Sequence, residues 1–272
     1  MKELMLVTGG LGGIGRSVAK KWLAASPLHW AVLIDRRETK TAEIAAAFGE
    51  RVTYEKCDVT NAAAVEATYA RACRGHKLRV AVNNAGVGHA GYDHWQESVA
   101  VNLCAAISGT KSAAEIFREQ GEGGCVINVA SLAGVVPLPY SPVYSAAKAG
   151  VVSFVRSLDR QLRKEPFSVH ALCPSFTDTP LVSRITEALQ SHDADTRAAA
   201  TFVARATSAQ GGLMTPDVVA DALMRIVSDA QTGQSQPIMI VTPQTGAVYE
   251  DFPKHKSEVV IAAPSTALGR SQ

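Results

Sequence analysis

One short stretch of this chain places a phenol and an ammonium group four residues apart. In SPVYSAAKAG (141–150), Tyr144 and Lys148 are separated only by serine and alanine. On a helix, positions i and i+4 lie on one face about 6 Å apart. A free tyrosine has a pKa near ~10, and a nearby cation favours its phenolate form. The pair therefore predicts a general acid and base, in which Lys148 lowers the pKa of Tyr144.

Ser131 stands 13 residues before Tyr144, at the end of the apolar run CVINVAS. A hydroxyl there can hydrogen-bond the same substrate oxygen as the tyrosine and hold it in place. The three side chains together predict interconversion of a secondary alcohol and its ketone, with a hydride moving to or from a bound nicotinamide. A tyrosine–lysine pair by itself is also compatible with a plain surface helix, so the prediction depends on a cofactor site elsewhere.

A glycine-rich segment near the start of the chain has the pattern of a dinucleotide-binding loop. TGGLGGIG (8–15) follows the apolar run LMLVT and precedes a helical segment. Three of its glycines allow a tight turn, close approach of the backbone to a pyrophosphate and close helix packing, while the helix N-terminus offers N–H donors to the anion. These three are Gly9, Gly13 and Gly15.

Asp35 ends the apolar run WAVLID, 20 residues after Gly15. A carboxylate in this place accepts hydrogen bonds from the ribose diol of the cofactor and repels a 2′-phosphate. The loop and the acid together favour NAD. Arg36 and Arg37 come next in the chain, and an arginine beside this position can hold a 2′-phosphate. NADP therefore stays open as the alternative.

The elements that must position these groups alternate along the chain. Apolar runs of strand length recur between longer segments rich in Ala, Lys, Glu and Arg at helical spacing, and several runs are apolar on both faces. The runs cover residues 4–8, 30–35, 51–57, 78–84, 125–131, 167–173 and 237–242. We expect a single doubly wound α/β Rossmann domain over residues 1–250, with a seven-stranded, mostly parallel sheet and helices on both faces.

Two segments depart from this alternation. Residues 180–214 follow a strand but have the pattern of helix, polar connection and helix. An insertion there lies where open α/β sheets bind ligands, so it is either a cover over the substrate or a pair of ordinary surface helices. Residues 251–272 contain Pro and Ser without a clear period, and we expect them to form a C-terminal tail.

The composition is that of a globular protein, 47% hydrophobic and 19% charged. The formal net charge is +2, from 27 basic and 25 acidic residues, so no broad field attracts nucleic acid or an anionic membrane. The first apolar run begins almost directly after the first residue, which leaves no room for a secretion signal, and no apolar run approaches the ~18 residues of a membrane helix. We expect a cytoplasmic protein that binds a small molecule rather than a nucleic acid or a membrane.

The cysteines and histidines do not indicate a metal site. The five cysteines are odd in number, widely spaced and without a C-x-x-C motif. His89 and His94 are close in sequence, but their five-residue spacing does not align them on one face of a helix. We expect neither a bound metal nor a disulfide.

Eight motifs occur in the order typical of the short-chain dehydrogenase/reductase family, and the chain resembles its members with a T-G-x-x-x-G-x-G loop. The motifs are TGGLGGIG, Asp35, CDV (57–59), NNAG (83–86), Asn102 in AVNL, Ser131 in VASLAG, Tyr144-x-x-x-Lys148 and CPSFTDTP (173–180). The resemblance implies an NAD-dependent dehydrogenase acting on CH–OH groups. It also implies a homodimer or homotetramer, formed through the helix that starts near Val143.

The same resemblance implies roles for further residues. Lys148 would also bind the nicotinamide ribose, and Asn102 would hold a water that links Lys148 to solvent as a proton relay. The other cofactor contacts would come from the glycine loop and from segments that follow strands: Gly9, Leu11, Gly13, Ile14, Gly15, Asp35, Arg36, Cys57, Asp58, Val59, Asn84, Ala85, Gly86, Tyr144, Pro174, Thr177, Asp178 and Thr179.

Ser131, Ser141 and Phe176 are the candidate substrate contacts. The apolar residues 135–138 favour a medium-sized apolar substrate, such as a fatty hydroxy compound or a steroid. Ser141 stands where one NAD-dependent member of the family with a hydroxy-lipid substrate carries a glutamine, and Ser175 replaces the glycine usual in the family's P-G turn. Two rival interpretations are an NADP-linked carbonyl reductase and a non-catalytic nucleotide-binding regulator.

Overall fold

The computed structural model describes residues 2–159, 161–187 and 194–250. The strands are β1 (Glu3–Thr8), β2 (His29–Asp35), β3 (Val52–Lys56), β4 (Lys77–Asn83), β5 (Gly124–Val129), β6 (Phe167–Pro174), β7 (Ile238–Thr242) and β8 (Gly246–Tyr249). The α-helices are α1 (Gly13–Ala25), α2 (Thr41–Phe48), α3 (Ala62–Ala72), α4 (Trp95–Val99), α5 (Ala105–Gln120), α6 (Pro142–Asp159), α7 (Pro180–Glu187), α8 (Ala194–Ala209) and α9 (Pro216–Gln231). Short turns of other helical types are η1 (Ala100–Cys104), η2 (Leu132–Gly134) and η3 (Leu162–Lys164).

The strands form one twisted sheet in the order β3-β2-β1-β4-β5-β6-β7-β8. All pairs from β3 to β7 are parallel, and their carboxyl ends lie in register: Thr8 is level with Ile34 of β2 and with Asn83 of β4. The strand order reverses between β1 and β4. In open α/β sheets this switch point opens a crevice at the carboxyl edge, so the topology places the glycine loop beside the later functional segments.

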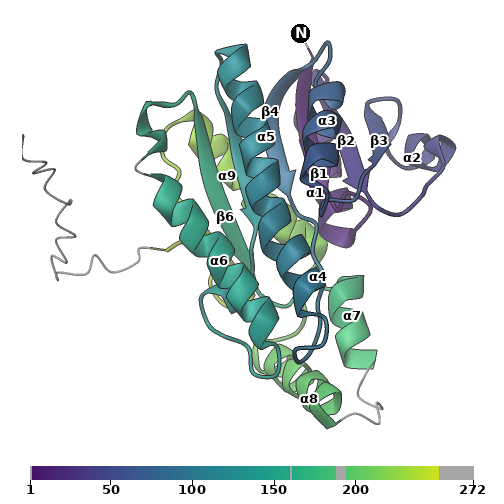
Figure 1. Ribbon diagram of the computed structural model, residues 1–272, viewed down its shortest axis with the longest axis vertical. Helices are drawn as coiled ribbons and strands as arrows, with labels where there is room; N and C mark the ends of the chain where they lie inside the picture. Colours follow the sequence, from purple (N-terminus) through teal and green to yellow (C-terminus); the bar gives the residue numbers. More distant parts are fainter. Residues whose placement is uncertain (1, 160, 188–193, 251–272) are drawn as a thin grey trace, which may run out of the picture.

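Helices cover both faces of the sheet (Figure 1). In this view α3, α5 and α6 lie in front of the strands and α1 and α9 behind them. Strand β1 shows why both faces are apolar: Leu4 and Leu6 belong to the core beneath the front helices, whereas Met5 and Val7 belong to the core on the other side. This division follows from the two-residue period of a strand.

Local chemistry fixes where the helices begin. The side chain of Asn61 accepts a hydrogen bond from the backbone N–H of Ala64 at 3.1 Å and caps the start of α3. Helices α6, α7 and α9 each begin with proline, whose fixed φ and missing N–H suit the first position of a helix. Because α6 begins at Pro142, Tyr144 and Lys148 lie in its first two turns.

The sheet has eight strands rather than the seven expected. The additional strand, β8, has four residues and pairs antiparallel with β7 after a tight turn. Its sequence is GAVY, and its side chains alternate between partly buried and exposed, so its apolar run is too short to mark a strand in the sequence. The helix, connection and helix expected over 180–214 correspond to α7 and α8, while residues 188–193 and the expected tail, 251–272, lie outside the described residues.

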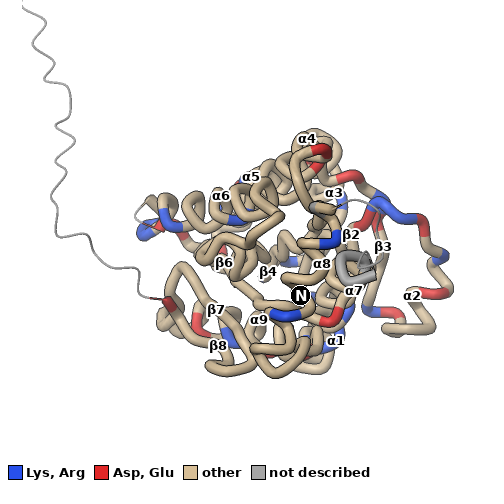
Figure 2. Tube along the Cα trace, turned by 90° about the horizontal axis from the view of Figure 1, so that it is seen from below, with Lys and Arg blue, Asp and Glu red and all other residues tan. Residues whose placement is uncertain are grey.

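Charged residues of both signs are interspersed around the outside of the molecule (Figure 2). Lys and Arg do not gather on one face in that view, which looks at the carboxyl edge of the sheet from below. Among the described helices, none combines the length and apolarity needed to cross a membrane.

Candidate active site

Three of the predicted catalytic side chains meet where β5 ends and α6 begins. Ser131 lies just after β5 and hydrogen-bonds Tyr144 on the first turn of α6. Lys148, one turn further, has its ammonium nitrogen 5.8 Å from the centre of the Tyr144 ring. The ammonium donates a hydrogen bond to the carbonyl oxygen of Val129 at 2.8 Å. The structure thus brings the serine, phenol and ammonium together as the sequence predicts.

These side chains face a cavity of about 320 Å³ at the carboxyl edge of the sheet. The cavity is also lined by many of the other predicted site residues. They are Ile14, Asn84, Gly86, Ser141, Pro174, Phe176, Thr177 and Thr179. Asp178 is not part of the lining; its side chain is exposed and its backbone N–H donates to the carbonyl oxygen of Met214 at 2.8 Å.

The electrostatics of the tyrosine–lysine pair differ from the expectation. Burial lowers the pKa of Lys148 from 10.5 to about 8, because an ammonium in a poorly solvated place loses its hydration. Burial also raises the pKa of Tyr144, and the hydrogen bond from Ser131 only partly offsets this effect. The expected lowering of the Tyr144 pKa is therefore not found in the protein without a cofactor, since desolvation of the phenol outweighs the hydrogen bond from Ser131.

Asn102 lies on the π-helical turn η1 and is almost fully buried. Its side-chain oxygen accepts from the N–H of Val87 at 3.1 Å, and its amide nitrogen donates to the carbonyl oxygen of Val87 at 2.9 Å and to the hydroxyl of Ser98 at 3.2 Å. A Cβ atom added at Gly86 would come within 3.2 Å of the Asn102 side-chain oxygen and 3.9 Å of the Lys148 ammonium. Asn102 and Lys148 therefore flank the same glycine.

Ser98 is a residue that the sequence analysis did not select. Its hydroxyl orients the Asn102 amide, and its side chain is 1% exposed. The four-residue spacing of Ser98 and Asn102 was readable in the sequence. That spacing, however, marks a hydrogen bond only once both residues are known to lie on one helical segment.

The glycine loop has the tight geometry that its sequence predicts. Gly9 has φ of 61°, and a Cβ atom there would approach the Cα of Ala85 to 2.9 Å. A Cβ atom at Gly15 would lie 2.7 Å from the carbonyl oxygen of Gly9. Side chains are thus excluded where the loop meets the first turn of α1, and backbone alone forms this part of the groove.

Thr8 and Asn84 join the glycine loop to the end of β4. The hydroxyl of Thr8 accepts from the N–H of Asn84 at 3.0 Å, and the Asn84 amide nitrogen donates to the carbonyl oxygens of Thr8 and Gly9 at 3.0 and 3.1 Å. The segment 84–86 therefore lies directly against the loop. Like Ser98, Thr8 is a positioning residue that the sequence analysis did not select.

Asp35 is buried at the end of β2 and is bonded on both sides. Its carboxylate accepts from the N–H of Leu11 in the glycine loop at 3.1 Å and from the guanidinium of Arg37 at 3.0 and 3.1 Å. Burial opposes ionisation of this carboxyl, but the hydrogen bonds from Arg37 and Leu11 outweigh it and keep the pKa of Asp35 below its ordinary value. The group is therefore an anion at neutral pH.

The second arginine, Arg36, points to a different acid. Its guanidinium donates to the carboxylate of Glu97 at 3.2 Å, and the other oxygen of Glu97 lies 3.3 Å from Nε2 of His89. His89 lines the cavity that contains Tyr144, so this chain of side chains connects the end of β2 with that cavity. The rings of His89 and His94 lie 4.6 Å apart.

The predicted adenine contacts follow β3. Asp58 is exposed, and its carboxylate accepts from the N–H and hydroxyl of Thr60 at 2.9 and 2.8 Å; these bonds lower the pKa of Asp58, with a smaller contribution from Arg36. Val59 is buried. Cys57 is buried as well and points its thiol to a backbone oxygen, and burial raises its pKa. The Cys57 side chain therefore belongs to the core rather than to a binding surface.

The helices α7 and α8 complete the cavity, and they supply a part of the site that the sequence did not specify. Five apolar residues on them line it: Leu181, Val182, Phe202, Val203 and Ala206. Of the apolar residues expected over 135–138, Val136 and Leu138 line the cavity, whereas Val135 packs on the core. Helices α7 and α8 thus contribute to the lining of the cavity, as the first of the two alternatives for the segment 180–214 requires.

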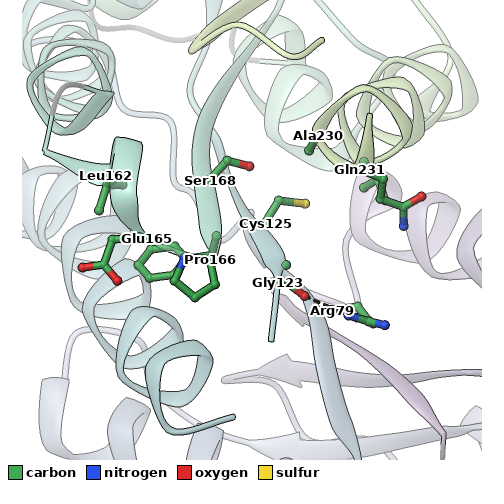
Figure 3. Close-up of a pocket in the computed structure, with 12 residues that line it drawn as sticks. Arg79, Gly123, Cys125, Leu162, Glu165, Pro166, Ser168, Ala230 and Gln231 are labelled. Carbon is green, nitrogen blue, oxygen red and sulfur yellow. Dashed lines mark hydrogen bonds between the residues drawn. The ribbon is translucent and has the colours of Figure 1, made fainter. Parts of the chain in front are cut away.

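A larger cavity, about 540 Å³, lies at the opposite, amino edge of the sheet (Figure 3). It is lined where β5 and β6 begin and where α9 ends, and none of the predicted site residues lines it. Arg79 donates to the carbonyl oxygen of Gly123 at 3.0 Å and to Glu3 at 2.9 Å, and Glu165 is paired with Arg118. Among the described residues, the two charged groups that line this cavity, Arg79 and Glu165, are therefore already paired.

Comparison with known proteins agrees with the site. The family model described as short chain dehydrogenase matches residues 3–190. The chain belongs to the short chain dehydrogenase family. This dehydrogenase is similar to 15-hydroxyprostaglandin dehydrogenase [NAD(+)] of Mus musculus, with 29% identity covering 97% of this chain and 98% of the relative. It is also similar to 3beta-hydroxysteroid dehydrogenase of Mediterraneibacter gnavus, with 34% identity covering 67% of this chain and 69% of the relative.

Solved structures show the same fold. A short chain dehydrogenase/reductase from Burkholderia phymatum, crystallised in complex with NAD, superimposes with a TM-score of 0.74 at 27% identity and covers 87% of this dehydrogenase and 88% of that chain. Levodione reductase superimposes with a TM-score of 0.78 at 23% identity, covering 90% and 97% of the two chains. The family and the α/β Rossmann fold predicted from the motifs are confirmed.

Proposed function

We propose that this dehydrogenase oxidises a secondary alcohol to its ketone with NAD, using Tyr144 as the acid and base. The observation that carries the proposal is the meeting of Ser131, Tyr144 and Lys148 in one cavity at the carboxyl edge of the sheet, next to the glycine loop. Asn102, whose side-chain oxygen lies beside Gly86 close to the Lys148 ammonium, is the fourth member of the group.

Each side chain has a separate task. Ser131 and Tyr144 both hydrogen-bond the substrate hydroxyl, and Tyr144 takes its proton. Bound NAD supplies the hydride acceptor, so the carbinol carbon loses a hydride while its oxygen loses a proton. Lys148 would donate to the nicotinamide ribose, and it places an ammonium near the phenol. Asn102 would hold a water through which the proton leaves toward solvent.

The groove fits a dinucleotide. Its floor is backbone, because Cβ atoms would collide at Gly9 and Gly15, and the start of α1 directs N–H groups to an anion. The remaining adenosine contacts would come from Asp58, Val59 and the segment 84–86. The nicotinamide contacts would come from Pro174, Thr177 and Thr179.

NAD is favoured over NADP by the partners of the two arginines. A 2′-phosphate needs a free cation, but the guanidinium of Arg37 is bonded to Asp35 and that of Arg36 to Glu97. Taking either arginine for a phosphate would leave a carboxylate without its partner. Asp35 in addition repels a phosphate at the ribose position.

The substrate is a medium-sized apolar alcohol, such as a fatty hydroxy compound or a steroid. The lining combines the reacting groups with apolar side chains from the segment after β5 and from α7 and α8. No carboxylate is present among the described residues that line it, so an amine on the substrate would find no counter-charge there. The similarity to dehydrogenases of hydroxyprostaglandins and hydroxysteroids supports the same class.

We propose in addition one dinucleotide-binding domain over residues 1–250 that works as a homodimer in the cytoplasm. The five cysteines are free, which suits a reducing compartment. Val151, Val152 and Val155 of α6 are buried within the protomer, so the face available to a partner is the small-residue side that includes Ala146 and Ala149. Light scattering coupled to size exclusion tests this assembly directly.

The decisive experiment replaces Tyr144 by Phe. We expect NADH formation from a panel of secondary alcohols to fall about 10²- to 10⁴-fold, while NADH binding, followed by fluorescence, is unchanged. Tyr140→Phe is the matched control, because Tyr140 is exposed on the neighbouring loop and should keep full activity. Full turnover by Tyr144→Phe would refute the mechanism. Bound NADH without turnover of any alcohol by the unmodified protein would instead favour a non-catalytic regulator.

A further inference from the structure

One polar side chain interrupts the apolar wall that α8 contributes to the catalytic cavity. Gln210 comes directly after the last residue of α8 and lines the cavity together with Phe202, Val203 and Ala206. The sequence analysis did not select it. A glutamine amide in an apolar wall needs partners, since an unbonded polar group in such surroundings is costly.

The amide of Gln210 is held in one orientation. The hydroxyl of Ser175 donates to its oxygen at 2.5 Å, and its nitrogen donates to the carbonyl oxygen of Gly212 at 3.2 Å. The backbone oxygen of Gly212 only accepts, so the nitrogen must face it and the oxygen must face Ser175. The two bonds together fix which end of the amide points where.

Ser175 is itself anchored to the sheet. Its N–H donates to the carbonyl oxygen of Val241 at the end of β7 at 2.9 Å, and its own carbonyl oxygen accepts from the hydroxyl of Thr177, also at 2.9 Å. Ser175 is 9% exposed and also lines the cavity. The position of the Gln210 amide is therefore set by the rigid end of the sheet rather than by the helix alone.

Within the part of the chain that the structure describes, the Gln210 amide keeps unused hydrogen-bonding capacity. A glutamine side chain has two N–H donors and two acceptor sites on its oxygen, and the contacts with Gly212 and Ser175 use one of each. We propose that Gln210, positioned by Ser175, determines specificity by binding a second, neutral oxygen of the substrate, a carbonyl or hydroxyl remote from the carbon that is oxidised. This inference rests on the proposed function, because it takes the cavity to be the alcohol site.

The test uses matched pairs of secondary alcohols that differ by one distant carbonyl. The rigid pair is 5α-androstan-3β-ol and 3β-hydroxy-5α-androstan-17-one, and the flexible pair is decan-2-ol and 9-hydroxydecan-2-one. Binding is measured by calorimetry on the NADH complex of Tyr144→Phe, in which the ketone is not reduced, and kcat/KM with NAD is measured separately on the active enzyme. In at least one pair we expect about tenfold tighter binding of the compound with two oxygens, the effect of one net hydrogen bond.

Four variants distinguish the loss of the Gln210 contact with the substrate from a general change in the shape of the cavity. Gln210→Leu should abolish the preference by weakening only the compound with two oxygens, and Ser175→Ala should reduce it, because the amide is then no longer held. Phe202→Leu alters the apolar lining and should affect both members of a pair alike. Ser208→Ala, on the exposed side of α8, should change nothing.

Equal affinities within both pairs, or a preference that survives Gln210→Leu, would overturn the inference. Failure of all four compounds to bind would overturn it as well, because the cavity would then not accept such alcohols. A binding preference that depends on Gln210, found without any NADH formation, has a different meaning. It would refute the proposed function and leave the role of Gln210 standing.

Discussion

The two cavities of this dehydrogenase lie at opposite edges of one sheet and differ in how their charges are satisfied. The cavity at the amino edge is the larger, about 540 Å³ against 320 Å³, yet its arginine and glutamate are both paired. The cavity at the carboxyl edge contains a buried ammonium, Lys148, whose one bonded partner among the described residues is a backbone carbonyl. A buried charge without a counter-charge indicates a functional site, whereas the volume of a cavity alone does not.

Parallel strands explain why the difference falls this way. The carboxyl ends of β1, β4, β5 and β6 meet at one edge, and the segments that leave them carry the glycine loop, Asn84, Ser131 and Pro174. At the amino edge the strands begin beside glycines packed tightly on their neighbours; a Cβ atom at Gly124 would lie 2.1 Å from the ring of Phe117. At the carboxyl edge an ammonium is bonded to a backbone carbonyl, whereas at the amino edge the charged groups beside the cavity are paired with opposite charges.

Replacing the unpaired charge gives the largest expected effect. Lys148→Met should lower kcat/KM by about 10²- to 10⁴-fold, because the ammonium beside the phenol and its ribose contact are both lost. The same variant should be more stable without cofactor, by on the order of 1–3 kcal/mol at pH 7, since a desolvated charge is removed. Denaturant unfolding and steady-state kinetics measure the two effects.

The pH dependence of the unfolding free energy tests whether the buried charge of Lys148 causes this difference in stability. The pKa of Lys148 is about 8 in the folded protein, below the 10.5 of a solvated lysine in the unfolded chain, so between these values the unfolded chain binds more protons and stability rises with pH. Unfolding free energies should show this rise in the unmodified protein and lose it in Lys148→Met. Lys111→Met, on the exposed side of α5, is the control. An identical pH profile in all three proteins would contradict the assignment.

A substitution of Asp35, at the carboxyl edge of the sheet beside the glycine loop, should have an intermediate effect on activity. Asp35→Asn keeps an oxygen for the N–H of Leu11 but removes the charge that binds Arg37. We expect kcat/KM for NAD to fall about tenfold and the preference for NAD over NADP to shrink, because a guanidinium is released and the repulsion of a 2′-phosphate disappears. Asp93→Asn, in an exposed loop, should leave both constants unchanged. An unaltered ratio of the two cofactors would show that Asp35 does not discriminate between them.

A substitution at the amino edge of the sheet should have the smallest effect on activity and on stability. Glu165→Gln breaks a partly exposed ion pair with Arg118 at the border of the larger cavity. Such pairs contribute about 0–1 kcal/mol, so unfolding free energy should change by no more than that and kcat/KM should stay within about twofold. A tenfold loss of activity would mean that the two cavities are coupled and would remove the contrast between them.

The sequence was most informative where residue type and local order suffice. Glycine spacing, the apolar run that ends at Asp35 and the four-residue interval from Tyr144 to Lys148 each describe a local structure, and each is found where expected. The short edge strand β8 was missed because its four residues, GAVY, make too short an apolar run. Gln210 was missed because its partner, Ser175, is 35 residues away.

The electrostatics of the site could not be obtained from the sequence at all. The pKa of Tyr144 depends on how completely the phenol is desolvated, and burial raises it despite the neighbouring lysine. The sequence left open whether Arg37 binds a 2′-phosphate. In the structure its guanidinium donates to both carboxylate oxygens of Asp35. Both results depend on distances between groups and on the water around them, which no pattern of residue types records.

The sequence alone determined the family and the alternation of strands and helices, and it predicted the side chains that we propose to react, because these depend on residues that are neighbours along the chain or along one helix. Tertiary structure decided which charges remain unpaired, which apolar side chains of α7 and α8 cover the cavity and how the Gln210 amide is turned. Those outcomes require segments far apart in the chain to meet, and burial then fixes the energy of every polar group that they enclose.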